Sequence, residues 1–550
     1  MKIAVFLSFA LLLSCGGGSR VPAPQGKPLA PVLTGMGAID FPVSTRSLQA
    51  QKFFNQGLAL VYGFNHDEAA RAFREAARLD PECAMAYWGL ALAIAPNVND
   101  PVPSPEREQE AFDAIAKAQK FSSGAAQNDR DMIAALAKRF STAKGKDRYE
   151  LNKAYAAAMK EVAAKYPNHV DAQTLYADAV MNTMPWDYWA KDGTPREGIP
   201  ETVKLVESTL ARWPNHTGIN HLHIHLVEAS NNPERALPSA ERLAELAPAA
   251  GHLVHMPAHI FMRVGRYRES AATNDRALKA DDSYLTQCRM QGLYPAMYHP
   301  HNWHFLVVSN MMLGNGAGAV DAARKMSGKV HHQPLKQKEF AVLQYWYGYP
   351  VAAMARFGKW DEILSEPQPD KDLMWTNAAW HYARALAYLG KGRVPESRVE
   401  LAKLRGIAAK PEFGELMVSP HNSMKTLAEI GIEIIEGELA AKQKNYDVAT
   451  ARLSRAVRLE DSLTYNEPPD WYYPVRHLLG AVLLEAGKPA EAEPVYWEDL
   501  RRNPDNGWAL FGLWKSLEAQ SKGERAAEIQ KRFVKAWEKA DFALGSSRLM

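Results

Sequence analysis

From about residue 46 onward, apolar residues recur at helical spacing in successive runs, and short polar turns separate these runs. The runs are rich in alanine and contain few stretches of β-branched residues, a composition that disfavours strands. We therefore expect an all-α fold in which a helix, a short turn and a second helix form the basic unit.

The helix pairs follow a repeating frame of about 34 residues. The unit at residues 50–83 has small residues, an aromatic residue and a closing proline at matching offsets: Gly57, Ala69, Phe73, Ala76 and Pro81. Small residues let two helices approach closely, the aromatic ring fills the seam between them, and proline ends the second helix. The same frame recurs at residues 217–250, 251–284 and 473–506, and the last of these contains Gly480 and Tyr496.

A repeat of this kind buries its apolar face only against its neighbours, so we expect roughly eight to ten stacked pairs with loop insertions between them. We divide the chain into a signal peptide, a Gly/Pro-rich tether, a first set of repeats, an insertion, and a second set of repeats with a capping helix at about residues 524–544. The corresponding ranges are 1–14, 15–45, 46–280, 281–299 and 300–550.

The N-terminus has a different character. Lys2 precedes an apolar run, residues 3–13, that is too short to span a bilayer. The run leads into Leu-Leu-Ser-Cys at residues 12–15, which resembles the signal of bacterial lipoproteins. That resemblance implies removal of residues 1–14, a lipid anchor on Cys15 and, since Gly16 follows, an outer-membrane location facing the periplasm. An ordinary cleaved signal peptide is the alternative.

Most of the expected mature chain resembles the bacterial tetratricopeptide-repeat lipoproteins. The segments that carry this resemblance are Phe-Asn-His-Asp-Glu-Ala at 64–69, Asp-Pro-Glu-Cys-Ala-Met-Ala-Tyr-Trp-Gly at 80–89, Gly-His-Leu-Val-His-Met-Pro at 251–257 and Pro-His-Asn at 300–302. The resemblance implies a right-handed helical solenoid with protein or peptide partners in the cell envelope. It implies no shared reaction, so function has to be argued from a site.

Histidines gather in the middle of the chain. Seventeen are present, and nine of them lie between residues 221 and 304. In tetratricopeptide repeats, positions 2, 5, 9 and 12 of the first helix of each pair face the concave groove. We take units that begin at Thr217, Gly251 and about Pro300. This frame predicts that seven histidines and a glutamate face one groove: His221, His225, Glu228, His252, His255, His259, His301 and His304.

Imidazoles four residues apart lie on one helical face, and facing imidazoles from neighbouring helices can share one ion. We therefore predict a transition-metal site, with zinc or copper as the favoured ions. Asp178 and Asp171 are expected either to add an oxygen ligand or to hold a histidine in the right tautomer, and His299 is a candidate ligand or supporting residue from the insertion. If the metal kept an open position and activated water, Glu228 would serve as general base.

Two other interpretations remain open for the groove. Histidines can hold a peptide or an anion without metal, or they can form a structural network by satisfying one another. We expect His223 to be structural, and His331 and His332 to lie at the surface. Trp186, Tyr188 and Trp189, in the predicted insertion at 185–200, either cover the groove or anchor their own loop.

Several function classes lack support in the sequence. A net charge of +3 gives no basic footprint for nucleic acid, and three cysteines cannot form a disulfide framework. The chain has no His-Glu-x-x-His and no phosphate-binding Gly-Lys-Ser/Thr loop. The same histidines also allow an alternative to the metal-binding scaffold, a metal-dependent enzyme.

Overall fold

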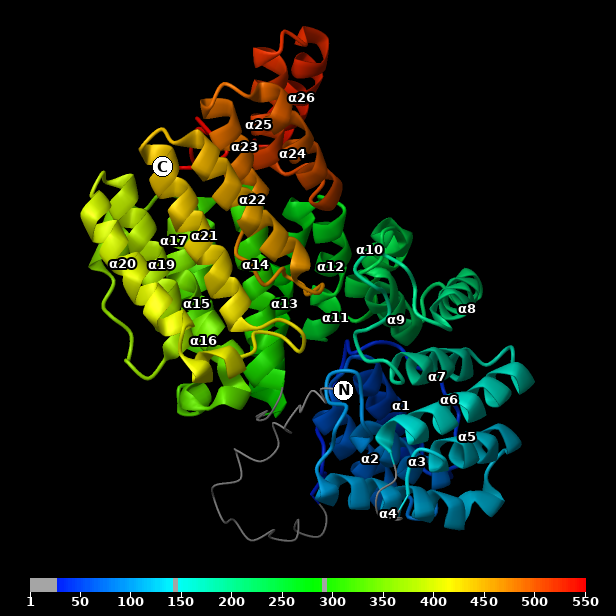
Figure 1. The fold of residues 1–550 in the computed structure, drawn as a ribbon. Helices are drawn as coiled ribbons and strands as arrows, with labels where there is room; N and C mark the ends of the chain where they lie inside the picture. Colours follow the sequence, from blue (N-terminus) through cyan, green and yellow to red (C-terminus); the bar gives the residue numbers. More distant parts are fainter. Residues whose placement is uncertain (1–26, 142–146, 289–293) are drawn as a thin grey trace. The chain divides into compact units, whose positions relative to one another are not determined.

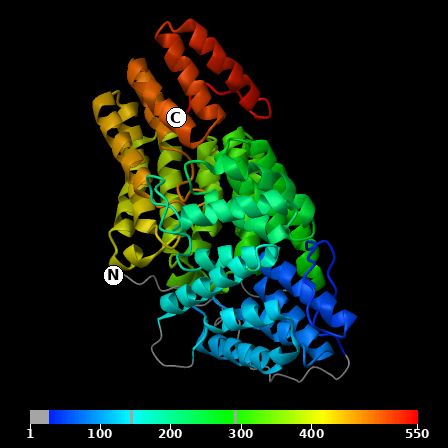
Figure 2. The same cartoon turned by 90° about the vertical axis from the view of Figure 1, so that its right-hand side faces the viewer.

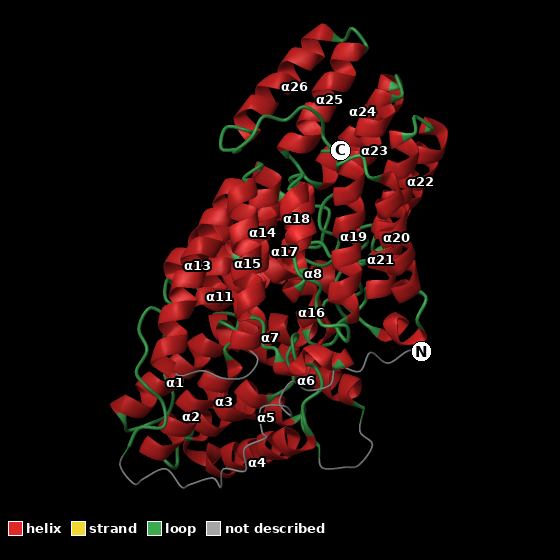
Figure 3. Ribbon diagram, turned by 90° about the vertical axis from the view of Figure 1, so that its left-hand side faces the viewer, coloured by secondary structure: helices red, strands yellow, loops and turns green. Residues whose placement is uncertain are grey.

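The computed structural model describes residues 27–141, 147–288 and 294–550. These residues form helices and loops, and no strand occurs among them (Figure 3). Helices occur as antiparallel neighbours along the chain, so the predicted all-α, tetratricopeptide-type solenoid is confirmed. Among the helices that the structure describes, none combines the length and apolar character needed to cross a membrane.

The chain forms two compact units, residues 1–260 with 276–298 and residues 261–275 with 299–550. The first unit contains α1 (Leu48–Tyr62), α2 (His66–Leu79), α3 (Ala84–Ile94), α4 (Pro105–Phe121), η2 (Ser122–Gly124), α5 (Gln127–Ala137), α6 (Arg148–Lys165), α7 (Val170–Met181), α8 (Ile199–Arg212), α9 (Thr217–Val227), η3 (Pro233–Ala236), α10 (Leu237–Leu246) and α11 (Gly251–His255). Both units share α12 (Pro257–Arg263) and α13 (Tyr267–Cys288), and the π-helix η4 (Tyr294–Tyr298) belongs to the first.

Helices α1 to α4 pack in sequence against one another (Figure 1). Phe73 of α2 is fully buried in their seam. A Cβ atom would lie 2.8 Å from its ring at Gly57 and 2.2 Å from it at Gly89, so both neighbouring helices need glycine there. The predicted role of small residues around one aromatic ring is thus confirmed in this repeat.

The described part of the predicted tether, residues 27–45, packs on the first repeats. Ala30, Met36 and Phe41 are buried, and the backbone N–H of Leu33 donates to Gln56 Oε1 at 2.8 Å. This differs from a free tether because the segment carries apolar side chains that gain stability by leaving water. Cys15 and the signal peptide lie outside the described residues.

The second unit continues with α14 (His299–Leu313), α15 (Gly316–Lys329), η5 (Gln333–Lys336), η6 (Lys338–Phe340), α16 (Ala341–Tyr347), α17 (Tyr349–Arg356), α18 (Trp360–Ser365), α19 (Met374–Gly390), α20 (Val394–Ala408), η7 (Pro411–Glu415), α21 (Met424–Lys442), α22 (Tyr446–Ser462), α23 (Arg476–Glu485), α24 (Pro489–Arg502), α25 (Gly507–Ala519) and α26 (Gly523–Ala536). Its last helices, orange to red in Figure 2, form neighbouring pairs. Tyr496 fills their seam as Phe73 does in the first unit, and a Cβ atom would lie 2.4 Å from its ring at Gly480 and 2.0 Å from it at Gly512.

Two segments differ from the predicted organisation. The predicted insertion at 281–299 is helical where described, because α13 runs on to Cys288 and His299 already begins α14. The final helix ends at Ala536, short of the predicted residue 544, and Leu544 instead packs as a loop residue in the cluster around Trp508.

Candidate metal centre

Helices α9, α11 and α12 carry the histidine cluster, which we define as His221, His225, His252, His255 and His259; all five residues belong to the first unit. Helix α9 begins at Thr217 and α11 begins at Gly251, the residues set by the repeat frame. His216 caps α9 by accepting a hydrogen bond at Nδ1 from the Ile219 backbone N–H at 3.2 Å. Pro257 has no N–H to continue α11, and α12 starts there and carries the last histidine of the cluster.

The five imidazole rings lie close to one another. Ring centroids are 4.8 Å apart for His221 and His225 and 4.9 Å apart for His221 and His252. The rings of His225 and His259 are 5.6 Å apart, and those of His255 and His259 are 4.8 Å apart. The structure therefore brings together five of the seven predicted histidines, all from the first unit.

Acceptors hold the Nδ1 side of three rings. His221 Nδ1 lies 2.6 Å from the Tyr62 carbonyl oxygen, which can only accept. Glu228 bridges two other rings, with Oε1 3.1 Å from His225 Nδ1 and Oε2 2.5 Å from His259 Nδ1. Burial lowers the pKa of His221 and of His225, so each of these two imidazoles is neutral, carries its proton on Nδ1 and presents a lone pair at Nε2.

The Nε2 atoms face one another. His221 Nε2 and His252 Nε2 are 3.1 Å apart, and His255 Nε2 and His259 Nε2 are 2.9 Å apart. One ligand atom from each of His221, His225 and His252 lies within 4.8 Å of the others. Nitrogens bound tetrahedrally to one zinc ion are about 3.3 Å apart, given a zinc–nitrogen distance of about 2.0–2.1 Å. The rings thus need only small shifts to share an ion.

His225 has a ring nitrogen whose lone pair is free to bind a metal ion. Its Nε2 atom is buried and has no hydrogen-bond partner within the described part of the chain. A buried polar nitrogen without a partner costs free energy unless another group, such as a metal ion, uses its lone pair.

Aromatic side chains surround the cluster. Phe64, which has a positive φ of 53°, stacks on His225 with ring centroids 5.5 Å apart and lies 4.4 Å from the His221 ring. Trp186 approaches His225 edge to face at 5.0 Å, so the predicted insertion at 185–200 does reach the histidines. These rings exclude water, which strengthens electrostatic interactions inside the cluster.

Burial also sets the charge of the cluster. It lowers the pKa of His221 and of His252 well below the usual histidine range, and neighbouring imidazoles lower both further. The pKa of His225 is lowered by burial despite the adjacent carboxylate. Burial raises the pKa of Glu228, but His259 and His225 outweigh that effect and bring it to about 2. At neutral pH these groups are therefore neutral imidazoles around a carboxylate, the protonation state that metal ligation requires.

Glu228 lies against two rings of the cluster. Both of its oxygens meet imidazole Nδ1 atoms, an arrangement typical of a carboxylate that orients metal-binding histidines from behind. Its role as a ligand or as general base stays a prediction.

The remaining predicted residues belong to helices other than α9, α11 and α12. His299, His301 and His304 belong to the second unit, where His304 packs against Tyr349 with ring centroids 4.9 Å apart. Asp178 shows no contact with the cluster among the described residues and lines a separate hollow. The metal-binding role of these residues stays a prediction.

Asp171, which we expected near the ligands, accepts hydrogen bonds from Tyr62 Oη at 2.7 Å and from His216 Nε2 at 3.1 Å, and so supports the turn next to the cluster. His216 was not singled out from the sequence. The position of His216 just before Thr217 could have indicated its capping role. His223 contacts Ser239 Oγ at 3.0 Å, and His331 and His332 are exposed, as expected.

Among the comparisons with known proteins, one match to a protein family supports the repeat fold. The tetratricopeptide repeat family matches residues 54–126. A search of curated proteins finds no match. Among solved structures, the human IFIT1 dimer with m7Gppp-AAAA is 12% identical, with 90% of this chain and 91% of that chain covered and a TM-score of 0.31. The APC/C hetero-tetramer Cut9–Hcn1 is 14% identical (85% and 76% covered, TM-score 0.31). The TPR domain of P58(IPK) is 11% identical (86% and 99% covered, TM-score 0.22). Such low values carry no information about function.

Proposed function

We propose that this protein is a cell-envelope repeat scaffold whose first unit binds a transition-metal ion through the histidine cluster. The observation that carries the proposal is the shared orientation of the imidazoles. The Nδ1 atoms of three imidazoles face a carbonyl or a carboxylate, and their Nε2 atoms point toward further imidazoles of the cluster. Outer hydrogen bonds of this kind are typical of metal-ligating histidines.

The residues that would hold the ion are His221, His225 and His252, because one ligand atom from each lies within 4.8 Å of the others. Imidazole ligands suit zinc and copper. When bound, such an ion would link α9 to α11 and could polarise a ligand that occupied a free coordination position. Glu228 would keep the imidazoles of His225 and His259 in the required tautomer.

The scaffold part of the proposal rests on the repeats. A tetratricopeptide repeat at residues 54–126 indicates a scaffold or protein-binding role. We propose protein or peptide partners in the envelope and attachment through lipidated Cys15. Replacement by Cys15→Ser should release the protein from the membrane fraction and remove the lipid mass from the mature N-terminus. Unchanged membrane attachment in that variant would contradict the anchor.

A metal-dependent enzyme is the second candidate. The observation that favours it is that the compact group offers three histidines, and zinc sites with three protein ligands are commonly catalytic. In the cobalt-substituted protein, a shift of the visible absorption bands on adding azide would reveal an exchangeable position. Unchanged bands would support a closed, structural site.

The metal-free interpretations make a different prediction. If the His221–His252 and His255–His259 contacts are simply hydrogen bonds in a structural or anion-binding network, the protein should take up no metal. We would dialyse the purified full chain against chelator, titrate it with zinc and with copper, and measure bound metal by elemental analysis. We expect stoichiometric uptake with a matching rise in thermal stability.

A double variant of exposed histidines, His331→Ala with His332→Ala, controls for adventitious surface binding. It should bind the same amount of metal as the unmodified protein. Metal uptake that disappears with these two surface residues, or no uptake at all, would refute the proposed function.

A further inference from the structure

Residues 27–45, which we call the strap, contain no helix and lie along the first unit before α1 begins. The side-chain amide of Gln56 on α1 holds two backbone groups of the strap at once. Its Nε2 donates to the Pro31 carbonyl at 2.9 Å, and its Oε1 accepts from the Leu33 N–H at 2.8 Å. An amide that both donates and accepts in this way fixes the register of the strap on the helix.

Gln51, earlier on the same helix, makes the same kind of contact farther along the strap. Its Nε2 donates to the Phe41 carbonyl at 2.8 Å, and its Oε1 accepts from the Val43 N–H at 2.9 Å. Neither glutamine is hydrogen-bonded to a histidine of the cluster in the described part of the chain. Helix α1 therefore holds the strap at two separate points.

The stretch of strap between these two points lies on the elements that carry the histidine cluster. The Gly35 carbonyl accepts a hydrogen bond from the Ala249 N–H at 2.9 Å, just before α11 begins. A Cβ atom at Gly37 would lie 3.0 Å from Oγ1 of Thr217, the first residue of α9. Both glycines have a positive φ, 74° and 109°, so other residues would be strained there. The docked strap thus contacts the start of both helices.

Met36 brings the strap next to the cluster itself. Its side chain is buried and lines a small hollow together with Gly251 and His252 of α11. His252 is one of the residues proposed to hold the ion. Because the interior is closely packed, a movement of the strap would change the packing beside this histidine.

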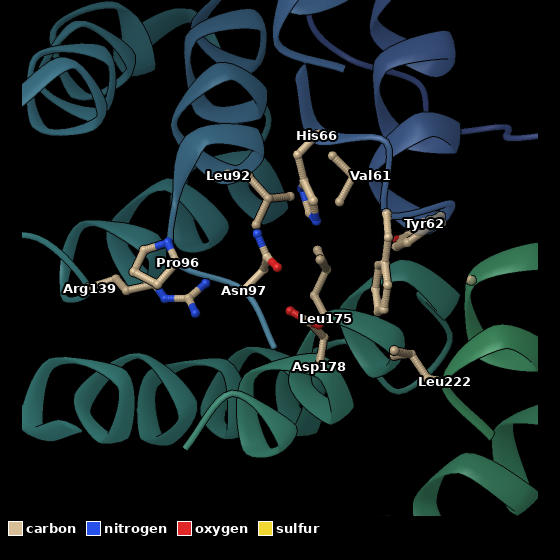
Figure 4. A pocket seen from close by; sticks show the side chains of 12 residues that line it. Val61, Tyr62, His66, Leu92, Pro96, Asn97, Arg139, Leu175, Asp178 and Leu222 are labelled. Carbon is tan, nitrogen blue, oxygen red and sulfur yellow. The ribbon is translucent and has the colours of Figure 1, made fainter. Parts of the chain in front are cut away.

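Helix α1 also contacts the helix that carries the other two proposed ligands. The carbonyl oxygen of Tyr62, the last residue of α1, lies 2.6 Å from His221 Nδ1. Figure 4 shows the side chains of Tyr62 and of Leu222 from α9 lining one small hollow. The contacts therefore form a closed circuit, in which α1 holds the strap, the strap contacts α9 and α11, and α9 contacts α1.

We propose that metal binding and strap docking stabilise each other, so that loading the cluster with metal closes the strap and loss of metal loosens it. This inference rests on the proposed metal site. An ion bound by His221, His225 and His252 would fix α9 relative to α11, the pair of helices whose starts the docked strap contacts. Whichever event comes first lowers the entropy cost of the second. Because coupling of this kind is reciprocal, the docked strap raises metal affinity by the factor by which the ion stabilises docking.

Hydrogen exchange measures the docking of the strap. The N–H groups of Leu33 and Val43 are held by the two glutamines and exchange when the strap opens. We would compare the full chain with and without bound zinc by mass spectrometry of peptides that cover residues 28–45, with α4 of the same unit as reference. Zinc should slow exchange in the strap by about 5- to 150-fold, the usual range of such coupling, and slow it less in α4.

A double variant, Gln51→Ala with Gln56→Ala, removes both amide contacts on the strap. It should bind zinc more weakly in chelator competition, by up to the factor by which zinc slows exchange in the strap. Gln173→Ala is the matched control, because this buried glutamine of α7 donates to two backbone carbonyls outside the strap, those of Ala163 at 2.8 Å and Tyr166 at 3.2 Å. Its zinc affinity should match that of the unmodified protein.

The outcomes separate this inference from the proposed function. A protein that takes up no zinc in elemental analysis would refute the metal site, and the coupling with it. Zinc uptake with equal slowing of exchange in the strap and in α4 would leave the metal site intact and overturn the coupling. Unchanged zinc affinity in the double variant, or an equal loss of affinity in Gln173→Ala, would also overturn it.

Discussion

Replacing Glu228 by glutamine tests the orientation of the proposed metal ligands. In the structure, one carboxylate oxygen accepts a hydrogen bond from His225 Nδ1 at 3.1 Å, and the other oxygen lies 2.5 Å from His259 Nδ1 as an ion pair. An amide has one accepting oxygen and one donating nitrogen, so Glu228→Gln can satisfy only one of the two rings. The other ring has to move its proton to Nε2 or turn, and either change removes a lone pair from the cluster.

Loss of an outer carboxylate costs about 10–100-fold in metal affinity, which is about 1.4–2.7 kcal/mol. We expect a loss within this range for zinc, and the upper end if the ring that changes is His225. Competition with a chromophoric chelator at fixed pH measures the dissociation constant, and circular dichroism verifies that the variant is folded.

The second unit offers a matched control. Glu400 accepts from His381 Nδ1 at 2.5 Å, and both side chains are buried, but neither belongs to the histidine cluster. Glu400→Gln should therefore leave zinc affinity unchanged. A folded Glu228→Gln variant that binds zinc as tightly as the unmodified protein would refute the reasoning about orientation, and equal losses in both variants would show a general effect of folding stability.

Three further results are expected. His252→Ala should lower zinc affinity by more than about 100-fold, the largest loss expected when only a supporting residue is removed. His255→Ala should retain zinc binding. If chelator competition shows the reverse order, the ion is bound elsewhere. Burial lowers the pKa of His304 from 6.5 to about 3. Between these two pH values, this histidine is protonated in the unfolded chain but not in the folded chain. Unfolding free energy should therefore fall by up to about 1.4 kcal/mol per pH unit as pH drops through this range, and urea titrations should show a shallower fall for His304→Phe. Gly512→Ala would place a Cβ atom 2.0 Å from the Tyr496 ring and should destabilise the second unit by about 1–3 kcal/mol in the same assay, a stabilised variant being the contrary result.

The repeat frame predicted much of the local structure because its signals are local. Small residues, an aromatic ring and a closing proline fixed where α9 and α11 begin, and the helical spacing then placed His221 and His225 on one face. Convergence of the first-unit histidines followed from this register alone. The seam around Phe73 was predictable for the same reason, since Gly57 lies in the same repeat.

Other features depend on contacts between residues far apart in sequence. The hydrogen bond between His221 and the Tyr62 carbonyl joins positions that are 159 residues apart in sequence. Phe64, which contacts the cluster, has a positive φ that phenylalanine rarely adopts. Periodicity also placed Asp178 near the predicted groove, yet its carboxylate turns into a different hollow. Such orientations follow from the packing of whole helices, which a one-dimensional pattern does not specify.

The most direct measurement is anomalous diffraction at the zinc absorption edge from crystals of the zinc-loaded protein. The account predicts one strong peak about 2.0–2.1 Å from the Nε2 atoms of His221, His225 and His252. It also predicts that Glu228 remains beside the Nδ1 atoms of His225 and His259 and does not contact the ion. A peak confined to exposed histidines, or an ordered cluster with no peak beside its Nε2 atoms, would contradict the central claim.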